Sequence, residues 1–311
     1  MRPAILIHGP TASGKTALAI RLAQRMGGVI LNADAMQVYG DLDVLTARPD
    51  ASELAAAEHR LFGTVDAAAP HSVGKWLKDV SAEIESVRAA GATPIVVGGT
   101  GLYLQALTEG LSEVPGIAPE ITREVRARIR ADGAGAWEEL RCVDPVSAAR
   151  IRPGDRQRVS RALEVFTGTG RPLSAFQSAA VPFLKPGEWM GVALTPPREI
   201  LYVRINNRVT AMVKAGAVEE ARRLWERSLP RELPVMRAHG MPGFCEYFEG
   251  RASEAEALDR CRRDTRRYAK RQLTWIAHQF TLWPRVPSMD LDVRARVIEI
   301  MARQAGLAGA G

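Results

Sequence analysis

A glycine-rich stretch near the start of the chain has the residue types and the spacing that bind a polyphosphate. Residues 9–16 match the phosphate-loop pattern G-x-x-x-x-G-K-[ST] in full. In such a loop, backbone N–H groups turn toward phosphate oxygens, the lysine adds a positive charge and the last hydroxyl binds Mg²⁺. The expected phosphate-binding residues are Gly9, Pro10, Thr11, Ala12, Ser13, Gly14, Lys15 and Thr16, and Thr16 is also the expected Mg²⁺ ligand. The pattern leaves open which phosphate compound binds and what is done to it.

Asp34 is the next residue whose type and place suggest chemistry. It follows residues 29–33, an apolar run that predicts a buried strand. In open α/β sheets the carboxyl ends of parallel strands face the ligand, so Asp34 could bind Mg²⁺ or act as a general base there. It could also merely cap a helix over residues 35–39.

A second glycine turn, formed by residues 98–101, follows a strand expected over residues 93–97. Glycines at such a place also occur in ordinary strand-to-helix turns, so they do not identify a site by themselves. No acidic residue ends this strand, although P-loop proteins that transfer or hydrolyse phosphate often hold Mg²⁺ with an aspartate there.

Alternating strands and helices must position these residues. Residues 3–7 predict a strand directly before the phosphate loop, and residues 16–23 predict a helix directly after it. Further helices are expected over 50–61 and 72–90, and another strand over 189–194. This order predicts an α/β fold, with a P-loop core whose mostly parallel sheet is flanked by helices, plus a helical insertion domain.

The pattern changes between residues 112 and 187, where helices follow one another without a convincing strand. Helices are expected near residues 119–132, 134–142, 145–151 and 155–167. The predicted domains are therefore a catalytic core of residues 1–111 and 188–311 and a helical insertion of residues 112–187. Within the insertion, Arg158 and Arg161 lie one helical turn apart on a face that is either simply solvated or in contact with an anion.

The C-terminal part of the chain is expected to be helical and basic. One helix containing Arg204 and Arg208 is expected to run on through residues 219–224, and residues 289–311 predict an ordinary helix without visible chemistry. Between residues 260 and 271 the bases outnumber the acids, and Tyr268 lies among them. Such a cluster suits an RNA backbone with exposed bases better than a surface laced by ion pairs.

Composition supports an anionic partner and limits the other classes. The chain of 311 residues has 42 Lys and Arg against 35 Asp and Glu, a formal net charge of +7. Its three cysteines have neither a disulfide-framework nor a zinc spacing, so we expect reduced thiols and no metal cluster. No apolar run reaches the length of a membrane span, and the first strand is too short for a signal peptide, so we expect a soluble, cytoplasmic protein.

Five ordered blocks carry a resemblance to a known family. They are GPTASGKT at 9–16, DAMQVY at 34–39, GGTGLY at 98–103, DRQRVSRALE at 155–164 and YAKRQ at 268–272. Together they resemble the bacterial tRNA dimethylallyltransferases, also called tRNA isopentenyltransferases, over roughly residues 3 to 278. Five spaced blocks in one order are far more specific than the phosphate loop alone.

The resemblance implies transfer of a dimethylallyl group from dimethylallyl diphosphate to N6 of the adenosine 3′ adjacent to the anticodon in tRNA, with release of diphosphate. It implies Mg²⁺ as cofactor and the anticodon stem-loop and dimethylallyl diphosphate as partners, and we expect a monomer that binds no membrane. The implied catalytic residues are Asp34, Thr100, Lys15 and Arg208. The implied tRNA-binding residues are Asp34, Ala35, Met36, Gln37, Thr100, Arg123, Gln157, Arg158, Val159, Ser160, Arg161, Lys270, Arg271 and Gln272.

In the roles that the resemblance implies, Lys15 and Arg208 stabilise the departing diphosphate, and Asp34 orients the amine and takes its proton. A leaving diphosphate also explains why the strand over residues 93–97 needs no acidic end. The segment 239–244 differs from the family pattern, so no tRNA contact is expected from it.

Three other functions are compatible with parts of the sequence. A prenyltransferase of free adenine nucleotides would share the phosphate loop and Asp34 but leave the insertion and the basic cluster unexplained. A small-molecule kinase would use the loop for ATP. A non-catalytic RNA-binding protein would retain the loop only for structure.

Overall fold

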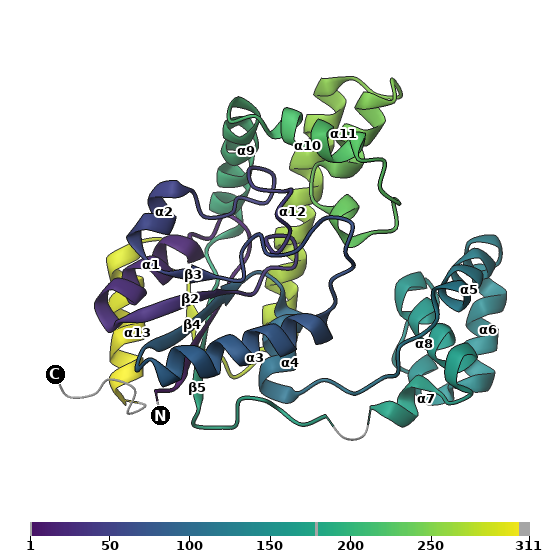
Figure 1. Cartoon of the computed structure of the whole chain (residues 1–311), viewed down its shortest axis with the longest axis horizontal. Helices are drawn as coiled ribbons and strands as arrows, with labels where there is room; N and C mark the ends of the chain where they lie inside the picture. Colours follow the sequence, from purple (N-terminus) through teal and green to yellow (C-terminus); the bar gives the residue numbers. More distant parts are fainter. Residues whose placement is uncertain (1, 178–179, 305–311) are drawn as a thin grey trace. The chain divides into compact units, whose positions relative to one another are not determined.

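A single parallel sheet of six strands forms the centre of the first of two compact units (Figure 1). The structure, a computed structural model, describes residues 2–177 and 180–304. The strand order is β3-β2-β4-β1-β5-β6, and every neighbouring pair is parallel. The strands are β1 (Ala4–His8), β2 (Gly28–Asn32), β3 (His59–Arg60), β4 (Thr93–Gly98), β5 (Trp189–Leu194) and β6 (Arg285–Val286). The α/β fold class predicted from the sequence is confirmed.

The register of the sheet brings the sequence motifs together at one edge. His8, the last residue of β1, pairs with Gly98 at the end of β4, and Asn32 at the end of β2 pairs with Val97. The phosphate loop, Asp34 and the turn over residues 98–101 therefore all leave the sheet at its carboxyl edge, as the strand pattern predicts.

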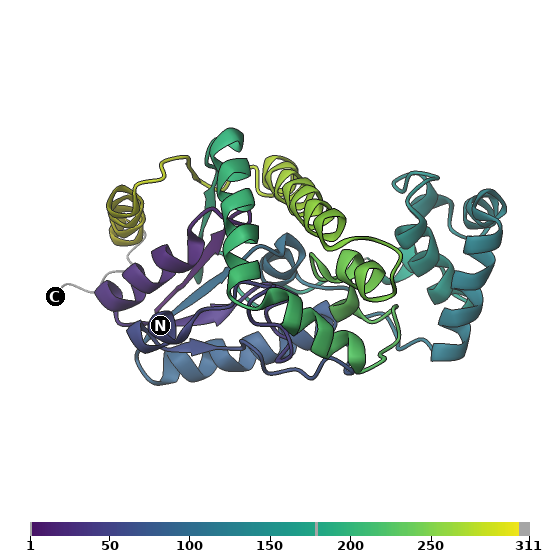
Figure 2. The same cartoon turned by 90° about the horizontal axis from the view of Figure 1, so that it is seen from above.

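Helices cover both faces of the sheet. Helix α1 (Lys15–Met26) and helix α13 (Leu291–Gln304) pack side by side on one face, while α3 (Val73–Ala89) lies on the opposite face (Figure 2). The core below α1 and α13 is built from fully buried side chains such as Ile5, Ile7, Leu18 and Ile298. Isoleucine and leucine at these positions bury the apolar area that holds the phosphate loop's strand and helix together.

The first unit contains further helices around this sheet (Figure 1). They are α2 (Ala51–Ala56), α4 (Gly101–Glu109), α9 (Arg198–Lys214), α10 (Ala217–Glu226), α11 (Met241–Phe248) and α12 (Glu254–Gln279), with a 3₁₀ turn at Pro234–Arg237. Helices α9 and α12 pack against each other, and Ala12 of the phosphate loop is buried with Leu201, Ile205 and Ala269 in the cluster between them. This packing attaches two basic helices directly to the phosphate loop.

The second unit spans Glu109–Phe183 and is helical. It contains α5 (Pro119–Ala131), α6 (Gly133–Val143), α7 (Pro145–Ala148), α8 (Arg156–Thr169) and a 3₁₀ turn at Leu173–Phe176. Its own core includes Val125, Leu140 and Leu163. The edges lie a few residues before the expected 112–187, because Leu184 is fully buried in the first unit and its N–H donates to the Leu107 carbonyl.

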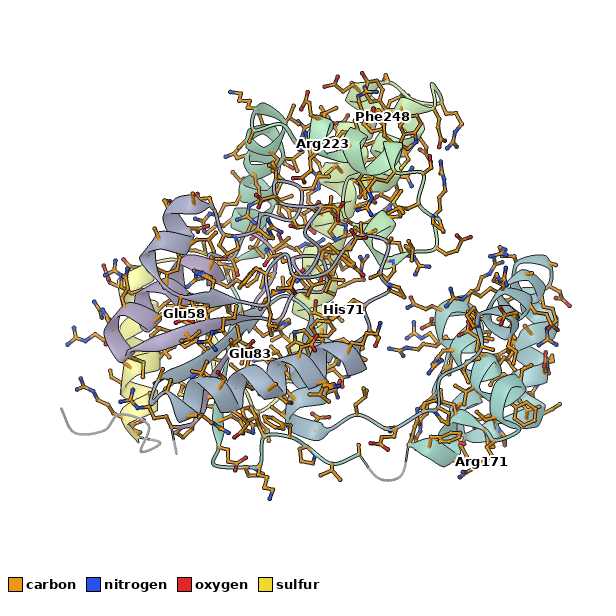
Figure 3. All side chains as sticks on the ribbon, viewed as in Figure 1. Glu58, His71, Glu83, Arg171, Arg223 and Phe248 are labelled. Carbon is orange, nitrogen blue, oxygen red and sulfur yellow. The ribbon has the colours of Figure 1, made fainter. Side chains whose placement is uncertain are left out.

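Three local predictions were wrong, each for a tertiary or steric reason. The helix expected over 50–61 ends at Ala56, because His59 pairs with β2, and Arg60 forms ion pairs with Glu58 and Glu83. Figure 3 labels these two glutamates. Residues 35–39 form turns rather than a helix. The long helix expected through residue 224 is interrupted at Gly216, whose φ of 92° is left-handed. The expected terminal helix is present up to Gln304, and residues 305–311 lie outside the described residues.

Within the described ranges, no helix is both long and apolar enough to span a membrane. Cys142, Cys245 and Cys261 are free thiols, as expected from their spacing.

Candidate active site

The phosphate loop joins β1 to α1 in a conformation that presents backbone N–H groups. Ala12 and Gly14 have φ values of 63° and 81°, and the Ser13 N–H donates to the Pro10 carbonyl at 3.1 Å. The first N–H groups of α1 have no acceptor within the helix, and the helix dipole adds partial positive charge at this end. The loop is therefore shaped for an anion before any side chain is considered.

Lys15 and Arg208 bring formal positive charge to the loop. Burial lowers the pKa of Lys15 to about 8, the nearby Asp34 carboxylate opposes this shift, and Arg208 adds to it. Burial also lowers the pKa of Arg208, with a further contribution from Arg204 one turn away on α9. Lys15 is thus close enough to Asp34 and to Arg208, two other expected catalytic residues, for each of them to act on it electrostatically.

Asp34 is held by its own turn. The Asp34 N–H donates to Asn32 Oδ1 at 2.8 Å, and Asp34 Oδ1 accepts from the Met36 N–H at 3.0 Å. Asn32 is fully buried and its Nδ2 also donates to the Asp34 and Leu61 carbonyls. No helix follows, so the helix-cap explanation of Asp34 is wrong, and the carboxylate is oriented by turn geometry with one oxygen engaged.

Thr100 lies beside Asp34 through the turn after β4. Thr100 Oγ1 accepts from the Ala35 N–H at 2.9 Å, and the Thr100 hydroxyl also forms a hydrogen bond with Tyr268. A Cβ on Gly98 would lie 2.0 Å from the Ala33 carbonyl oxygen, so only glycine lets the two turns approach this closely. The glycine turn therefore has a packing role that positions Thr100 against the Asp34 turn.

Gln272 of α12 connects the phosphate loop to the same turn. Its side chain is buried; Oε1 accepts from the Thr11 N–H at 2.9 Å and Nε2 donates to the Gly99 carbonyl at 2.8 Å. Gln37 is similarly buried, and its Nε2 donates to the Thr46 and Ala47 carbonyls. For both glutamines this geometry favours a positioning role over the direct tRNA contact expected from the resemblance.

Tyr268 and His239 lie next to the Gly99 turn. The Tyr268 hydroxyl donates to the Gly99 carbonyl at 3.3 Å, and burial raises the Tyr268 pKa. The His239 ring centre is 4.7 Å from the Tyr268 ring, and burial lowers the His239 pKa, which keeps the ring neutral. No tRNA contact was expected from the segment with His239 because it differs from the family pattern, and the structure places this ring beside Tyr268 of α12.

A groove of about 220 Å³ opens beside His239. Arg237, Arg267 and Arg271 line it, together with Asp264. Three cations against one carboxylate make the groove suitable for a phosphate of a nucleic-acid backbone.

The basic residues of α12 differ in pairing and exposure, and Arg267 is exposed although its guanidinium lies 3.6 Å from Asp264. Arg260 forms ion pairs with Glu246 and Asp264, and Arg266 donates to Asn206 Oδ1 at 2.7 Å. The exposed basic residues lie at helical spacing on one face; we call Arg263, Arg267, Lys270 and Arg271 the basic stripe. Only the stripe presents most of its charge to solvent.

The second unit contains the other residues expected at the tRNA. Gln157, Arg158 and Arg161 are exposed on α8, and Arg123 on α5 is exposed with Glu120 at 3.3 Å. Two further expected contacts on α8 have buried side chains: these are Val159, a core residue, and Ser160, whose hydroxyl donates to Glu164.

The residues present fit a Mg²⁺ ion held largely by its substrate. Thr16 offers one hydroxyl in the first turn of α1, and Asp34 offers a carboxylate near Lys15. Across residues 2–177 and 180–304, no three His, Cys, Asp or Glu side chains are grouped as metal ligands. Mg²⁺ at phosphate sites takes one or two protein ligands and otherwise binds phosphate oxygens and water, which matches this donor set.

Family comparisons agree with this arrangement. The family described as IPP transferase matches residues 37–279, and the family described as isopentenyl transferase matches residues 3–65. A protein of Hyphomonas neptunium named tRNA dimethylallyltransferase is 50% identical over 306 residues, which is 98% of this chain and 97% of that protein. A protein of Maricaulis maris with the same name is 47% identical and covers 94% of this chain and 95% of its own.

Solved structures give the same result. The full-length tRNA isopentenylpyrophosphate transferase of Bacillus halodurans is 31% identical, with a TM-score of 0.70 over 98% of this chain and 97% of that one. A eukaryotic dimethylallyltransferase described as acting on tRNA has a TM-score of 0.82 at 26% identity, covering 99% of this chain and 80% of that one. On the fold, the ordered motifs and these matches along nearly its whole length, the chain belongs to the IPP transferase family.

Proposed function

We propose that this chain transfers a dimethylallyl group from dimethylallyl diphosphate to N6 of the adenosine 3′ adjacent to the anticodon in tRNA. Relatives about half identical over nearly the whole chain carry the name tRNA dimethylallyltransferase, which supports this reaction. The observation that carries the proposal is the single carboxylate of Asp34 beside Lys15 of the phosphate loop. Because no acidic residue ends β4, the site suits a diphosphate that departs better than a phosphate that is transferred.

The phosphate loop would hold the leaving group. As the bond between C1 of the dimethylallyl group and the diphosphate oxygen breaks, negative charge grows on that oxygen. The backbone N–H groups of the loop, Lys15 and Arg208 would together stabilise this charge, because preorganised donors are worth most where charge develops. Mg²⁺, when held by Thr16, would add positive charge on the diphosphate.

Asp34 would act on the nucleophile. The lone pair of the exocyclic amine is delocalised into the adenine ring, so the amine needs orientation and proton removal. The free oxygen of Asp34 can accept one N6 hydrogen and take that proton as the bond between N6 and C1 forms. Thr100, which lies beside the Asp34 turn, would help to fix the base.

An adenosine stacked in an anticodon loop cannot reach this site, so the base must be turned out of its stack. The basic stripe of α12 and the exposed side chains of Gln157, Arg158 and Arg161 are the surfaces that we assign to the RNA. A monomer acting in the cytoplasm remains our expectation from the sequence.

Label transfer tests the proposed function. The purified chain is incubated with labelled dimethylallyl diphosphate, Mg²⁺ and an anticodon stem-loop, and with a matched stem-loop in which the target adenosine is replaced by guanosine. We expect label only in the adenosine stem-loop, and none in AMP offered instead of RNA. Label in AMP alone would indicate a prenyltransferase of free nucleotides, and phosphate transfer from ATP would indicate a kinase.

A further inference from the structure

Arg294 of α13 is a buried cation that belongs to none of the sequence motifs. It is 2% exposed and is among the largest fully buried side chains of the molecule. Its helix packs beside α1, with Ala295 and Ile298 in the core below the phosphate loop. An arginine in such an apolar setting has a high desolvation cost unless something compensates its charge.

No carboxylate within the described part of the chain forms an ion pair with Arg294. Its guanidinium donates to the Ser288 carbonyl, to the Ser13 carbonyl at 2.5 Å and to Met289 Sδ at 3.3 Å, all of them uncharged. Burial lowers the pKa of Arg294, and the neighbouring Arg204 lowers it further. The described chain therefore supplies no counter-charge for Arg294, and a bound anion would supply one.

The bond to Ser13 has a direct consequence for the phosphate loop. The peptide between Ser13 and Gly14 is planar and trans, so its C=O and N–H point in opposite directions. Because Arg294 draws the Ser13 carbonyl to its side, the Gly14 N–H is turned the other way, away from Arg294. Donation by a cation to the carbonyl also polarises the peptide and strengthens its N–H as a donor.

The approach of Arg294 also depends on glycine at position 14. A Cβ there would lie 3.4 Å from Arg294 Nη1 and 3.9 Å from Arg204 Nη1, on a backbone whose φ of 81° disfavours any side chain. Both guanidinium groups therefore lie close to the Gly14 backbone.

We propose that Arg294 is a positioning residue for diphosphate binding: it fixes the Ser13–Gly14 peptide so that the Gly14 N–H serves the anion, and its uncompensated charge is balanced when the diphosphate binds. This inference rests on the proposed function, since it takes the diphosphate as the anion. In this role Arg294 does not touch the diphosphate. It acts through the phosphate loop, which binds the diphosphate directly.

Three variants test this role, with Arg296 as the matched control. Arg296 lies two residues away on the same helix and is exposed, so Arg296→Met removes the same charge without touching the loop. Arg294→Met replaces the buried guanidinium by an apolar side chain, and Arg294→Lys keeps the charge but loses the fork of donors. The readouts are the Tm of the unliganded chain, the Kd of inorganic pyrophosphate with Mg²⁺ by calorimetry, and the KM for tRNA.

For Arg294→Met we expect pyrophosphate affinity to fall by about tenfold or more, as for other residues that orient a ligand-binding group. The unliganded Tm should stay within about 2 °C of the wild type, because an unpaired buried charge is removed along with its bonds. Arg294→Lys should lie between Arg294→Met and the wild type in affinity. Arg296→Met should change neither quantity, and the KM for tRNA should stay unchanged throughout.

Unchanged pyrophosphate affinity in Arg294→Met would overturn the inference. A second result would also overturn the inference: a lower Tm of the unliganded chain, together with the same pyrophosphate Kd in Arg294→Met and Arg294→Lys. That pattern describes a residue with a structural role only. If the Met variant does not fold, the Lys variant decides: a loss of several-fold supports the role and an unchanged Kd overturns it. A wild-type chain that binds no pyrophosphate contradicts the proposed function itself, and that result is distinct from a difference between variants.

Discussion

Two groups of cations in this molecule differ in how their charges are balanced. Beside the phosphate loop, Arg208 and Arg294 make no ion pair with a carboxylate of the described chain, and burial lowers the pKa of both. On α12, Arg260 is paired with Glu246 and Asp264, and its pKa is raised by the bond to Glu246. The first group has no ion-pair partner, with Arg294 buried and Arg208 half-buried, whereas the half-buried Arg260 of the second group is neutralised by two carboxylates.

The difference shows which charges need a ligand. An uncompensated buried cation is costly until an anion reaches it, while an exposed ion pair needs no partner and contributes little to stability. The number of basic residues in α12 therefore overstates the positive charge that this helix presents to RNA. Only the basic stripe is available to bind it. The few unpaired cations near the phosphate loop therefore indicate a ligand site more clearly than the larger basic cluster of α12 does.

The largest expected effect comes from Asp34, the carboxylate that acts electrostatically on Lys15 of the phosphate loop. Asp34→Asn keeps an oxygen for the Met36 N–H but cannot take a proton. We expect the single-turnover rate of transfer to fall by about 10²–10⁴-fold, while the Kd for tRNA changes little. A rate within about tenfold of the wild type, or a large loss of tRNA affinity, would assign Asp34 to another role.

The next effect tests the basic stripe. Replacing Arg267, Lys270 and Arg271 together with alanine should weaken anticodon stem-loop binding by about tenfold or more at moderate salt. The slope of log K against log salt should fall by about 2–3, since each lost phosphate contact removes roughly 0.7–0.9.

The matched control for the stripe removes three exposed arginines from α1 and α13, namely Arg25, Arg296 and Arg303. It carries the same change in net charge. Equal losses in the stripe variant and the control would mean that binding follows overall charge and not this helix.

The smallest effect is a pH dependence from Lys15. Burial has lowered its pKa from the usual 10.5 to about 8, so the free enzyme loses this proton as the pH rises through that value. A bound diphosphate favours the charged amine and raises its pKa, so the complex holds more protons than the free enzyme. Affinity for pyrophosphate, corrected for the ligand's own ionisation, should therefore be flat below about pH 8 and fall by up to about tenfold per unit above it.

Calorimetry in buffers of different ionisation enthalpy measures the proton uptake directly. Uptake by the wild type above about pH 8 that disappears in Lys15→Met would support the assignment. The same uptake in both proteins would mean that another group titrates.

The sequence predicted the central fold because its signals there are local. Four apolar runs, each followed by a turn or a glycine loop, identify β1, β2, β4 and β5 and place their carboxyl ends at one edge. The two-residue strands β3 and β6 are too short to have a pattern of their own, and they form only because β2 and β5 are there to pair with. Tertiary pairing decides such elements, and no local signal exists for them.

The sequence predicted the site residues that would act on the substrates directly. It did not predict the residues that act by positioning others. Lys15, Asp34 and Thr100 lie where the motifs indicate. The bridging role of Gln272 and the contact of Arg294 with Ser13 join segments more than 250 residues apart, with separations of 261 and 281 residues. Such contacts depend on the packing of α12 and α13, and a single sequence contains no trace of them.

A double comparison of ligand binding tests the central claim, that unpaired cations serve the diphosphate and the basic stripe serves the RNA. The Kd values of pyrophosphate and of the anticodon stem-loop are measured for Arg208→Met and for the triple variant of the stripe. We predict that Arg208→Met loses at least about tenfold in pyrophosphate affinity with stem-loop affinity unchanged, and that the stripe variant shows the reverse. Equal losses of both ligands in both variants would contradict the division of the molecule into these two groups of cations.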